Sequence, residues 1–395
     1  MKLPLILLLL SVVPSNGALL AHVQTTRGTI SVELQHASAP QAVANFMTLA
    51  LGSRSRIHPL TGAVTNAPLY IGEKFFRTAN SSSFKFAQTG SGSGTNAGSS
   101  GFTFRDEFIP SIRHTGYTLS SANAGPNTNG GQIFFTGNVV IPQYDDVHSI
   151  IGLIPDPVSR GVIDAVIGAG DNATTITGIT FERTDPAATA FNENAQGLPV
   201  VSALEGSISL IPKTSVTFTP KSPLVAVSQL RAFRSTNLST WAEITPSFVG
   251  NQSAPLASSV IDNATLPKAF YRLSGIRYPD DETISSLASA TFVASLPGII
   301  LTYQFDASGN GGTVTAATPG QPDASGPFTL TARSASPYKL VLTTDNGTTV
   351  NPRNLRYTVH SDDFLPGQST GRVSVQYLNF IFWQNLTSGT YTLSP

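Results

Sequence analysis

Cysteine is absent from the 395-residue sequence, and charged residues are scarce. The lack of cysteine excludes disulfide bonds, thiolate metal sites and cysteine nucleophiles. Lys, Arg, Asp and Glu together make up 12% of the residues, and 23 basic residues balance 23 acidic ones. A chain without an excess of positive charge is not expected to bind nucleic acid. Its stability must come from packed cores, for which 40% hydrophobic residues over this length suffice.

The few histidines do not have the spacing of a metal site. None lies four residues from another, as two ligands on one helix face would, and HExxH does not occur. The acidic pair Asp145-Asp146 and the run Asp280–Glu282 are typical of turns or of solvated surface. The sequence therefore predicts no metal ion and no cofactor. The six histidines are His22, His36, His58, His114, His148 and His360.

The N-terminus has the pattern of a secretion signal. Lys2 supplies a minimal positive charge, and residues 3–13 form an apolar run of the length found in signal peptides. Small residues before Ala18 offer a cleavage site, so a signal peptide is predicted over residues 1–17. The run is too short to span a bilayer, which needs about 20 residues, and no later segment suits a span better. An exported protein, periplasmic or secreted, is expected; a buried N-terminal helix is the alternative.

Turn-forming residues are abundant, with 34 Gly and 27 Pro. Together with short alternating apolar stretches, they predict a mainly β protein. A hairpin is predicted over residues 23–34 and a strand over 176–183, with helices over 39–52 and 158–167. The Gly/Ser-rich residues 90–101 lack the Gly-Lys-Ser/Thr ending of a phosphate-binding loop. Apolar runs resume on both sides, which favours a loop inside a domain.

Composition divides the chain into several units. Residues 22–185 are predicted to form a first domain, and residues 186–200 a linker. Two strand-rich blocks follow, a β module over 201–276 and a C-terminal module over 282–395. Their alternating stretches predict one or two antiparallel β-sandwich domains. Both blocks could serve as spacers, as surfaces that contact carbohydrate, or as envelope attachments, and the sequence does not choose among these roles.

Residues 119–137 (LSSANAGPNTNGGQIFFTG) combine three properties that a peptide-binding groove needs. Ala122 and Gly125 have almost no side chain, so another backbone can approach closely. Asn123 and Gln132 offer amide groups for hydrogen bonds, and Phe134 offers apolar surface. A loop followed by a core strand is the simpler alternative reading of the same residues.

The same stretch resembles the signature of the cyclophilins, and other segments resemble landmarks of that family in the same order. Lys74-Phe75-Phe76-Arg77 resembles the strand with the catalytic arginine. The resemblance extends over residues 22–185 and implies a closed eight-stranded β-barrel with two capping helices. It also implies peptidyl-prolyl cis/trans isomerase (rotamase) activity on proline-containing polypeptides, and hence a role in protein folding. The other matching segments are 26–34, 39–49, 86–90, 104–108 and 144–152.

The resemblance also implies a role for each site residue. Arg77 would be catalytic, because a guanidinium can donate to the prolyl nitrogen of the twisted amide. Phe86 and Phe134 would line the proline pocket, and Gln88 would orient Arg77. Because the segment between Arg77 and Gln88 is longer than usual for the family, either Phe84 or Phe86 can fill the pocket position. The implied substrate-binding residues are Phe86, Gln88, Ala122, Asn123, Gln132, Phe134, Tyr144 and His148.

A second class of function is compatible with the sequence. The strand-rich residues after 200 make up nearly half of the chain. The protein could therefore be a non-catalytic secreted or surface-displayed binding protein, in which a degenerate isomerase domain accompanies a tail that contacts glycan or the cell envelope. The presence of Arg77 together with Gln88 and Phe134 favours the enzyme.

Overall fold

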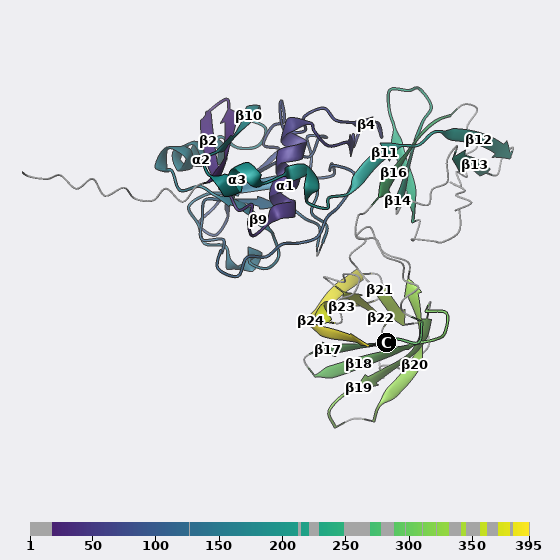
Figure 1. Cartoon of the computed structure of the whole chain (residues 1–395). Helices are drawn as coiled ribbons and strands as arrows, with labels where there is room; N and C mark the ends of the chain where they lie inside the picture. Colours follow the sequence, from purple (N-terminus) through teal and green to yellow (C-terminus); the bar gives the residue numbers. More distant parts are fainter. Residues whose placement is uncertain are drawn as a thin grey trace, which may run out of the picture.

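The computed structural model describes most of the chain, and Figure 1 shows its strands gathered in three groups. The signal peptide predicted over residues 1–17 lies outside the described residues. These are residues 18–125, 127–211, 215–220, 229–248, 269–277, 288–296, 298–309, 311–320, 322–331, 341–344, 356–361, 370–379 and 382–394.

The first group is one curled eight-stranded sheet. The edges are joined by backbone hydrogen bonds between residues 72–75 and residues 174–176, including a bridge between Lys74 and Thr175. All strand pairs are antiparallel. In spatial order the strands are β10 (Ile176–Arg183), β1 (Leu19–Thr25), β2 (Gly28–Leu34), β9 (Ile150–Leu153), β7 (Thr118–Ser121), β8 (Ile133–Thr136), β6 (Lys85–Thr89) and β5 (Arg77–Asn80).

Two helices accompany this sheet, close to the predicted bounds. Helix α1 (Pro40–Leu51) begins with a proline in its first turn and ends at Gly52, whose left-handed backbone is easily adopted without a side chain. Helix α2 (Pro157–Ala169) is capped by Asp156, whose carboxylate accepts the backbone N–H of Val158 and Ser159. Both predicted helices are confirmed.

The stretch predicted as a linker is folded against the first domain. It contains helix α3 (Pro186–Ala190) and the short 3₁₀ helix η2 (Glu193–Ala195). Arg183 donates hydrogen bonds to two carbonyls of this stretch and pairs with Glu193 at 2.7 Å. Ala188 and Leu198 are buried in the same core as the first sheet. Residues 186–200 therefore cover the first domain instead of merely leading away from it.

The second group is a four-stranded antiparallel sheet that packs on the first domain. Its strands in order are β11 (Val200–Ala203), β16 (Phe270–Arg277), β14 (Gln229–Ser235) and β15 (Ala242–Phe248). A separate hairpin is formed by β12 (Gly206–Ile211) and β13 (Ser215–Pro220). Val201, Phe233 and Ile276 of the sheet belong to the core cluster of the first domain. The segment over residues 53–70, which follows α1, contains a small two-stranded pair, β3 (Arg56–Ile57) with β4 (Val64–Thr65).

The third group corrects the predicted C-terminal sandwich. Its eight strands close into a barrel, because the first strand pairs with the second on one side and with the last on the other. The β character of the tail is confirmed, but a two-sheet sandwich would leave open edges, and this ring has none. The strands are β17 (Thr291–Leu296), β18 (Ile299–Phe305), β19 (Gly311–Ala317), β20 (Ala324–Thr331), β21 (Val341–Thr344), β22 (Arg356–Ser361), β23 (Thr370–Asn379) and β24 (Phe382–Ser394).

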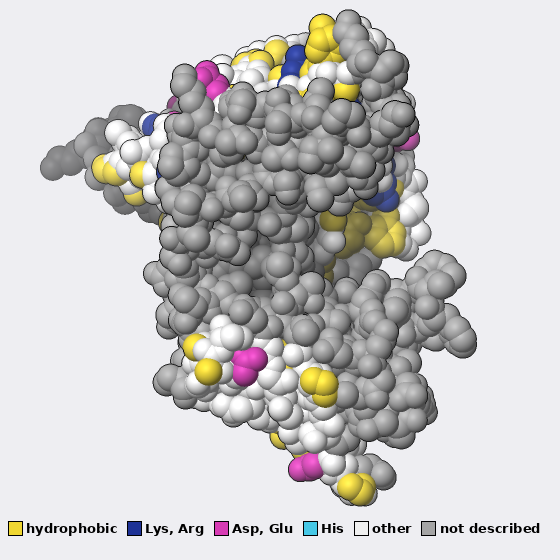
Figure 2. Space-filling view, turned by 90° about the vertical axis from the view of Figure 1, so that its right-hand side faces the viewer, with side chains coloured by type: hydrophobic (Ala, Val, Ile, Leu, Met, Phe, Trp, Pro, Cys, Tyr) yellow, Lys and Arg dark blue, Asp and Glu magenta, His cyan; other side chains and the backbone are white. Residues whose placement is uncertain are grey.

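The described surface reflects the low charge content. On the coloured part of the face in Figure 2, basic and acidic side chains lie scattered, without a patch of one sign. Among the described residues, no helix is long and apolar enough to cross a membrane.

Candidate active site

Strand register places the predicted catalytic residue and two predicted substrate-binding residues in one row. Arg77 on β5 is directly opposite Gln88 on β6, and Gln88 is directly opposite Phe134 on β8. Residues opposite each other on antiparallel strands point to the same face of the sheet. Phe86, two residues before Gln88, shares that face because side chains alternate along a strand. The curled sheet therefore presents a cation, an amide and two aromatic rings side by side.

Phe134 lies at the centre of an aromatic cluster. Its ring centroid is 6.3 Å from that of Phe86, 5.6 Å from Tyr144 and 5.2 Å from His148. Tyr144 comes from the 3₁₀ helix η1 (Pro142–Tyr144), which brings its ring within 4.9 Å of the His148 ring. Edge-to-face pairs of this kind stabilise a fixed arrangement of rings. The cluster supplies an apolar surface beside the row of Arg77 and Gln88.

The Arg77 guanidinium lies at the rim of this cluster. Its Cζ is 5.1 Å from the centre of the Phe86 ring, and the residue is exposed. Burial raises the pKa of the Tyr144 hydroxyl, and the positive charge of Arg77 partly opposes that shift. Tyr144 is therefore a neutral hydrogen-bond donor near neutral pH, and Arg77 is a solvated cation held over an aromatic ring.

The structure separates the two phenylalanines that the sequence left as alternatives. Phe86 is 6% exposed and contacts both Phe134 and Arg77. Phe84 is half-buried, and its ring lies 6.0 Å from that of Tyr144. The geometry thus places Phe86 in the floor of the cluster and Phe84 at its outer edge. The extra length of the β5–β6 connection is accommodated in the turn at residues 81–84, where Ser81 and Phe84 are hydrogen-bonded.

A chain of amide groups leads from the site to the Gly/Ser-rich loop. Gln88 Nε2 donates to Gln132 Oε1 at 2.7 Å. Gln132 Nε2 in turn donates to the carbonyls of Asn96 and Gly98, at 2.9 and 2.5 Å. Among the described residues, the Gln88 side chain thus bonds to Gln132, and no side-chain hydrogen bond links it to the Arg77 guanidinium. Residues 90–101 are part of the domain, as the sequence predicted.

The segment after β7 is fixed by its own hydrogen bonds. Ala122 N–H donates to the carbonyl of Gln132 at 3.0 Å. Asn123 Nδ2 donates to the carbonyl of Val147 at 2.6 Å, so its side chain is engaged with the loop that follows Tyr144. The side chain of Asn123 therefore ties two loops together.

His114 is a member of the cluster that sequence reasoning missed. Its ring stacks on Phe134 at a centroid distance of 6.3 Å and an angle of 11°. Its Nδ1 lies 2.9 Å from Asp145 Oδ1 and its Nε2 lies 3.1 Å from Ser120 Oγ. Burial lowers the pKa of His114, so the neutral ring donates from Nδ1 to the carboxylate. Asp145, predicted as a turn residue, thus holds a ring behind Phe134; only tertiary structure brings these residues together.

His148 is also neutral, and its tautomer is defined by one contact. Its Nδ1 lies 3.1 Å from the carbonyl oxygen of Ser121, which can only accept. Nδ1 therefore carries the proton, and Nε2 is left with a lone pair. Burial lowers the pKa of His148 to about 4.

The depressed pKa of His148 predicts acid sensitivity. The unfolded chain takes up the proton near the ordinary value of about 6.5, whereas the folded protein resists it until about pH 4. The stability contribution is therefore complete above pH 6.5 and is lost as the pH falls toward 4. Between pH 7 and pH 5 we expect wild type to lose about 1–2 kcal/mol more unfolding free energy than His148→Gln. Urea denaturation at both pH values measures this difference; parallel losses in the two proteins would contradict it.

Comparison with known proteins identifies the family. A family model described as cyclophilin type peptidyl-prolyl cis-trans isomerase/CLD matches residues 20–162. Peptidyl-prolyl cis-trans isomerase B of Streptomyces anulatus is 38% identical over 160 residues, which are 40% of this chain and 88% of the relative. Probable peptidyl-prolyl cis-trans isomerase A of Mycobacterium leprae is 37% identical over 147 residues, covering 37% of this chain and 79% of the relative.

A crystal structure of a cyclophilin type isomerase of Cryptosporidium parvum aligns with 43% of this chain and 99% of its own, at 22% identity and a TM-score of 0.35. From the family match and the relatives, this chain belongs to the cyclophilin-type peptidyl-prolyl cis-trans isomerases. The predicted resemblance, the mainly β fold and the enzyme class are confirmed. Among the residues that the structure describes, no three His, Asp or Glu side chains are grouped as metal ligands.

Proposed function

We propose that this isomerase acts on X-Pro bonds of exported polypeptides and that Arg77 stabilises the twisted amide. One observation supports the assignment above the others: the exposed Arg77 guanidinium lies 5.1 Å above the Phe86 ring, at the rim of the Phe134 cluster. A proline ring seated on that cluster would place its amide nitrogen beside the guanidinium. The aromatic cluster would then hold the proline ring while Arg77 acts on the X-Pro amide.

The chemistry requires a donor and no nucleophile. The C–N bond of an X-Pro amide has partial double-bond character, which creates a barrier of about 18–20 kcal/mol. In the twisted transition state the prolyl nitrogen regains its lone pair and can accept a hydrogen bond. A donor that acts only on this state lowers the barrier without binding the planar forms more tightly. Arg77 supplies such a donor, and the cation–π contact with Phe86 restrains its position.

The remaining residues hold the peptide. Phe86 and Phe134 receive the prolyl ring, with Tyr144 and His148 at the edge of the pocket. The backbone of Asn123, with Ala122 beside it, pairs with the extended substrate. Gln88 contacts the substrate, and Gln132 supports the polar side of the groove through its bond to Gln88. The substrate-binding residues are Phe86, Gln88, Ala122, Asn123, Gln132, Phe134, Tyr144 and His148.

The assignment is tested by exchange spectroscopy on a short X-Pro peptide with the full-length protein. The uncatalysed reaction takes about 10–100 s at 25 °C. Acceleration by about 10⁴-fold, which corresponds to about 5.5 kcal/mol, is expected in the presence of saturating enzyme. The same peptide should show only the spontaneous rate with buffer or with a heat-denatured sample. A wild-type rate equal to the spontaneous one would refute the proposal.

The export part of the proposal depends on residues 1–17. Their charged start, apolar run and small residues support cleavage before Ala18. The full chain expressed in a bacterial host should be recovered outside the cytoplasm and begin at Ala18, whereas a chain lacking residues 2–17 should stay inside. Fractionation with N-terminal sequencing measures both, and an uncleaved cytoplasmic full-length chain would contradict export. Glycan or envelope contact by the strand-rich residues after 200 stays a prediction.

A further inference from the structure

The Gly/Ser-rich loop is held between the active site and the second sheet. On one side, Gln132 donates to the carbonyls of Asn96 and Gly98. On the other side, Arg231 of β14 donates from Nη1 to the carbonyl of Gly101 at 2.9 Å. Residues 96–101 therefore connect a side chain of the appended sheet with the amide chain of the isomerase site.

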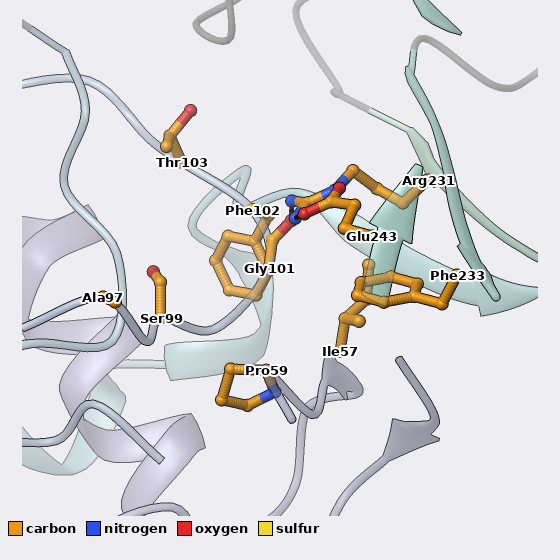
Figure 3. Close-up of a pocket in the computed structure, with 10 residues that line it drawn as sticks. All are labelled: Ile57, Pro59, Ala97, Ser99, Gly101, Phe102, Thr103, Arg231, Phe233 and Glu243. Carbon is orange, nitrogen blue, oxygen red and sulfur yellow. Dashed lines mark hydrogen bonds and ion pairs between the residues drawn. The ribbon is translucent and has the colours of Figure 1, made fainter. Parts of the chain in front are cut away.

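The Arg231 guanidinium has little freedom. Its Nη2 donates to Glu243 Oε2 at 2.6 Å, and its Nε donates to Glu243 Oε1, so the pair is bidentate. Its Cζ also lies 5.8 Å from the centre of the Phe233 ring. Figure 3 shows Arg231 and Glu243 side by side, facing Gly101 and Phe102 of the loop. Because every nitrogen of the guanidinium is engaged, the Gly101 carbonyl is held by a rigid donor.

The sheet that carries Arg231 packs on the segment over residues 53–70. A Cβ atom at Gly62 would come within 2.2 Å of the Phe233 ring, so the ring packs directly on the glycine backbone. Arg272 of β16 donates from Nη1 to the carbonyl of Thr61 at 2.7 Å, and its Cζ lies 4.0 Å above the Trp241 ring. Arg231 and Arg272 thus each donate to a carbonyl of the first domain.

The loop is closely packed against itself and against the first domain. A Cβ atom at Gly98 would come within 2.2 Å of the Ser91 carbonyl oxygen, and the Ser100 carbonyl accepts the Ile57 N–H at 2.9 Å. The loop nevertheless has space on the side of the second sheet. A cavity of about 160 Å³ lies between Ser99, Phe102 and Phe233, so the loop can move there when the Gly101 carbonyl is released.

We propose that Arg231 is a positioning residue for the isomerase: the appended sheet sets the geometry of the peptide-binding groove through residues 96–101. The inference rests on the proposed roles of Gln88 and Gln132. Loss of the Arg231 contact moves the carbonyls that orient Gln132, and Gln132 orients Gln88. In the proposed site, the Gln88 and Gln132 amides bind the planar and the twisted peptide equally well. Loss of the Arg231 contact should therefore raise KM and leave kcat unchanged.

The test compares two matched variants of the full-length protein. Arg231→Met and Arg272→Met each remove one guanidinium that bonds to a carbonyl of the first domain, and each keeps a long apolar side chain. Only Arg231 reaches the loop that Gln132 holds. With a tetrapeptide X-Pro substrate, we expect Arg231→Met to raise KM by about three- to tenfold with kcat within twofold of wild type. Arg272→Met should leave both constants unchanged, and the melting temperatures of the two variants should agree.

Two further variants test whether the effect of Arg231 on KM passes through its donor group and through Gln132. Arg231→Lys restores a donor and should recover part of the lost affinity. In the double variant with Gln132→Ala, the KM effect of Arg231→Met should vanish, because the loop no longer acts on the site. Equal KM changes in Arg231→Met and Arg272→Met, or full additivity with Gln132→Ala, would overturn the proposal. If wild type itself did not catalyse isomerisation, the proposed function would fail; an active wild type with an unaffected Arg231→Met would refute only the positioning role.

Discussion

Replacing Arg77 by alanine should lower kcat/KM for an X-Pro peptide by about 10²–10³-fold, because the variant loses the only donor proposed to act on the prolyl nitrogen in the twisted state. The folded protein should remain as stable as wild type, since Arg77 is exposed at an edge strand and its backbone pairing with Gln88 does not need the side chain. Exchange spectroscopy for activity and thermal melting for stability measure the two effects on the same samples.

Arg113 provides the matched control for this prediction. It is a half-buried arginine on the loop that precedes β7, and its guanidinium pairs with Asp146 at 3.0 Å. Arg113→Ala removes the same charge from the surface near the site but should change kcat/KM by less than twofold. Arg77→Lys keeps the charge and loses the planar donor group, and it should recover only part of the activity. An Arg77→Ala protein with wild-type rates would exclude the proposed mechanism.

Phe134→Ala should produce the largest loss of stability among the site variants. The ring is 4% exposed and is surrounded by Phe86, His114, Tyr144 and His148. Truncation leaves a cavity in a rigid aromatic cluster, which typically costs about 3–5 kcal/mol of unfolding free energy. The surviving folded protein should also bind X-Pro peptide poorly, because the apolar floor is gone. Urea denaturation and KM measure these effects.

The next residue on the same strand separates stability from binding. Phe135 is buried on the opposite face of β8, where its ring lies 5.9 Å from that of Phe75. Phe135→Ala should lose as much stability as Phe134→Ala, but its folded fraction should bind and isomerise peptide like wild type. If both variants lost affinity equally, the pocket role of Phe134 would be wrong, and Phe134 would only be a core residue.

Local patterns in the sequence predicted the local structure well. Proline in the first turn and glycine after the last turn bounded the helix predicted over 39–52, which is observed over 40–51. Alternating apolar residues predicted β10 over residues 176–183 with the observed bounds. Such signals depend on neighbours in the sequence and survive without knowledge of the tertiary structure.

Features that depend on distant contacts were not accessible from the sequence. The closure of β17 with β24 joins residues about a hundred positions apart, so alternation indicates strands but cannot distinguish a barrel from a sandwich. The same holds for the folded stretch at residues 186–200, whose turn-like composition suggested a linker. Its burial comes from contacts with the first domain that no short window contains.

The candidate site likewise contains residues that the sequence indicated and residues that only the tertiary structure brings together. The row of Arg77, Gln88 and Phe134 was proposed from family resemblance, and the structure places the three on neighbouring strands. His114 and Asp145 gave no sign of their partnership, because their 31-residue separation follows no helix or strand period. The choice between Phe84 and Phe86 required the register of β6. The sequence did not reveal that register, because the length of the preceding turn is unusual.

The cover over helix α1 has an evolutionary consequence. Every residue of α1 from Gln41 to Ala50 is buried, and Ala188 and Leu198 of the following stretch share its core cluster. A helix covered in this way can accumulate apolar residues on its outer face without promoting aggregation. Each such change makes deletion of the cover more destabilising. Residues 186–200 are thereby entrenched: a lineage that carries them cannot return to a bare isomerase domain by one deletion without exposing an apolar helix face to water.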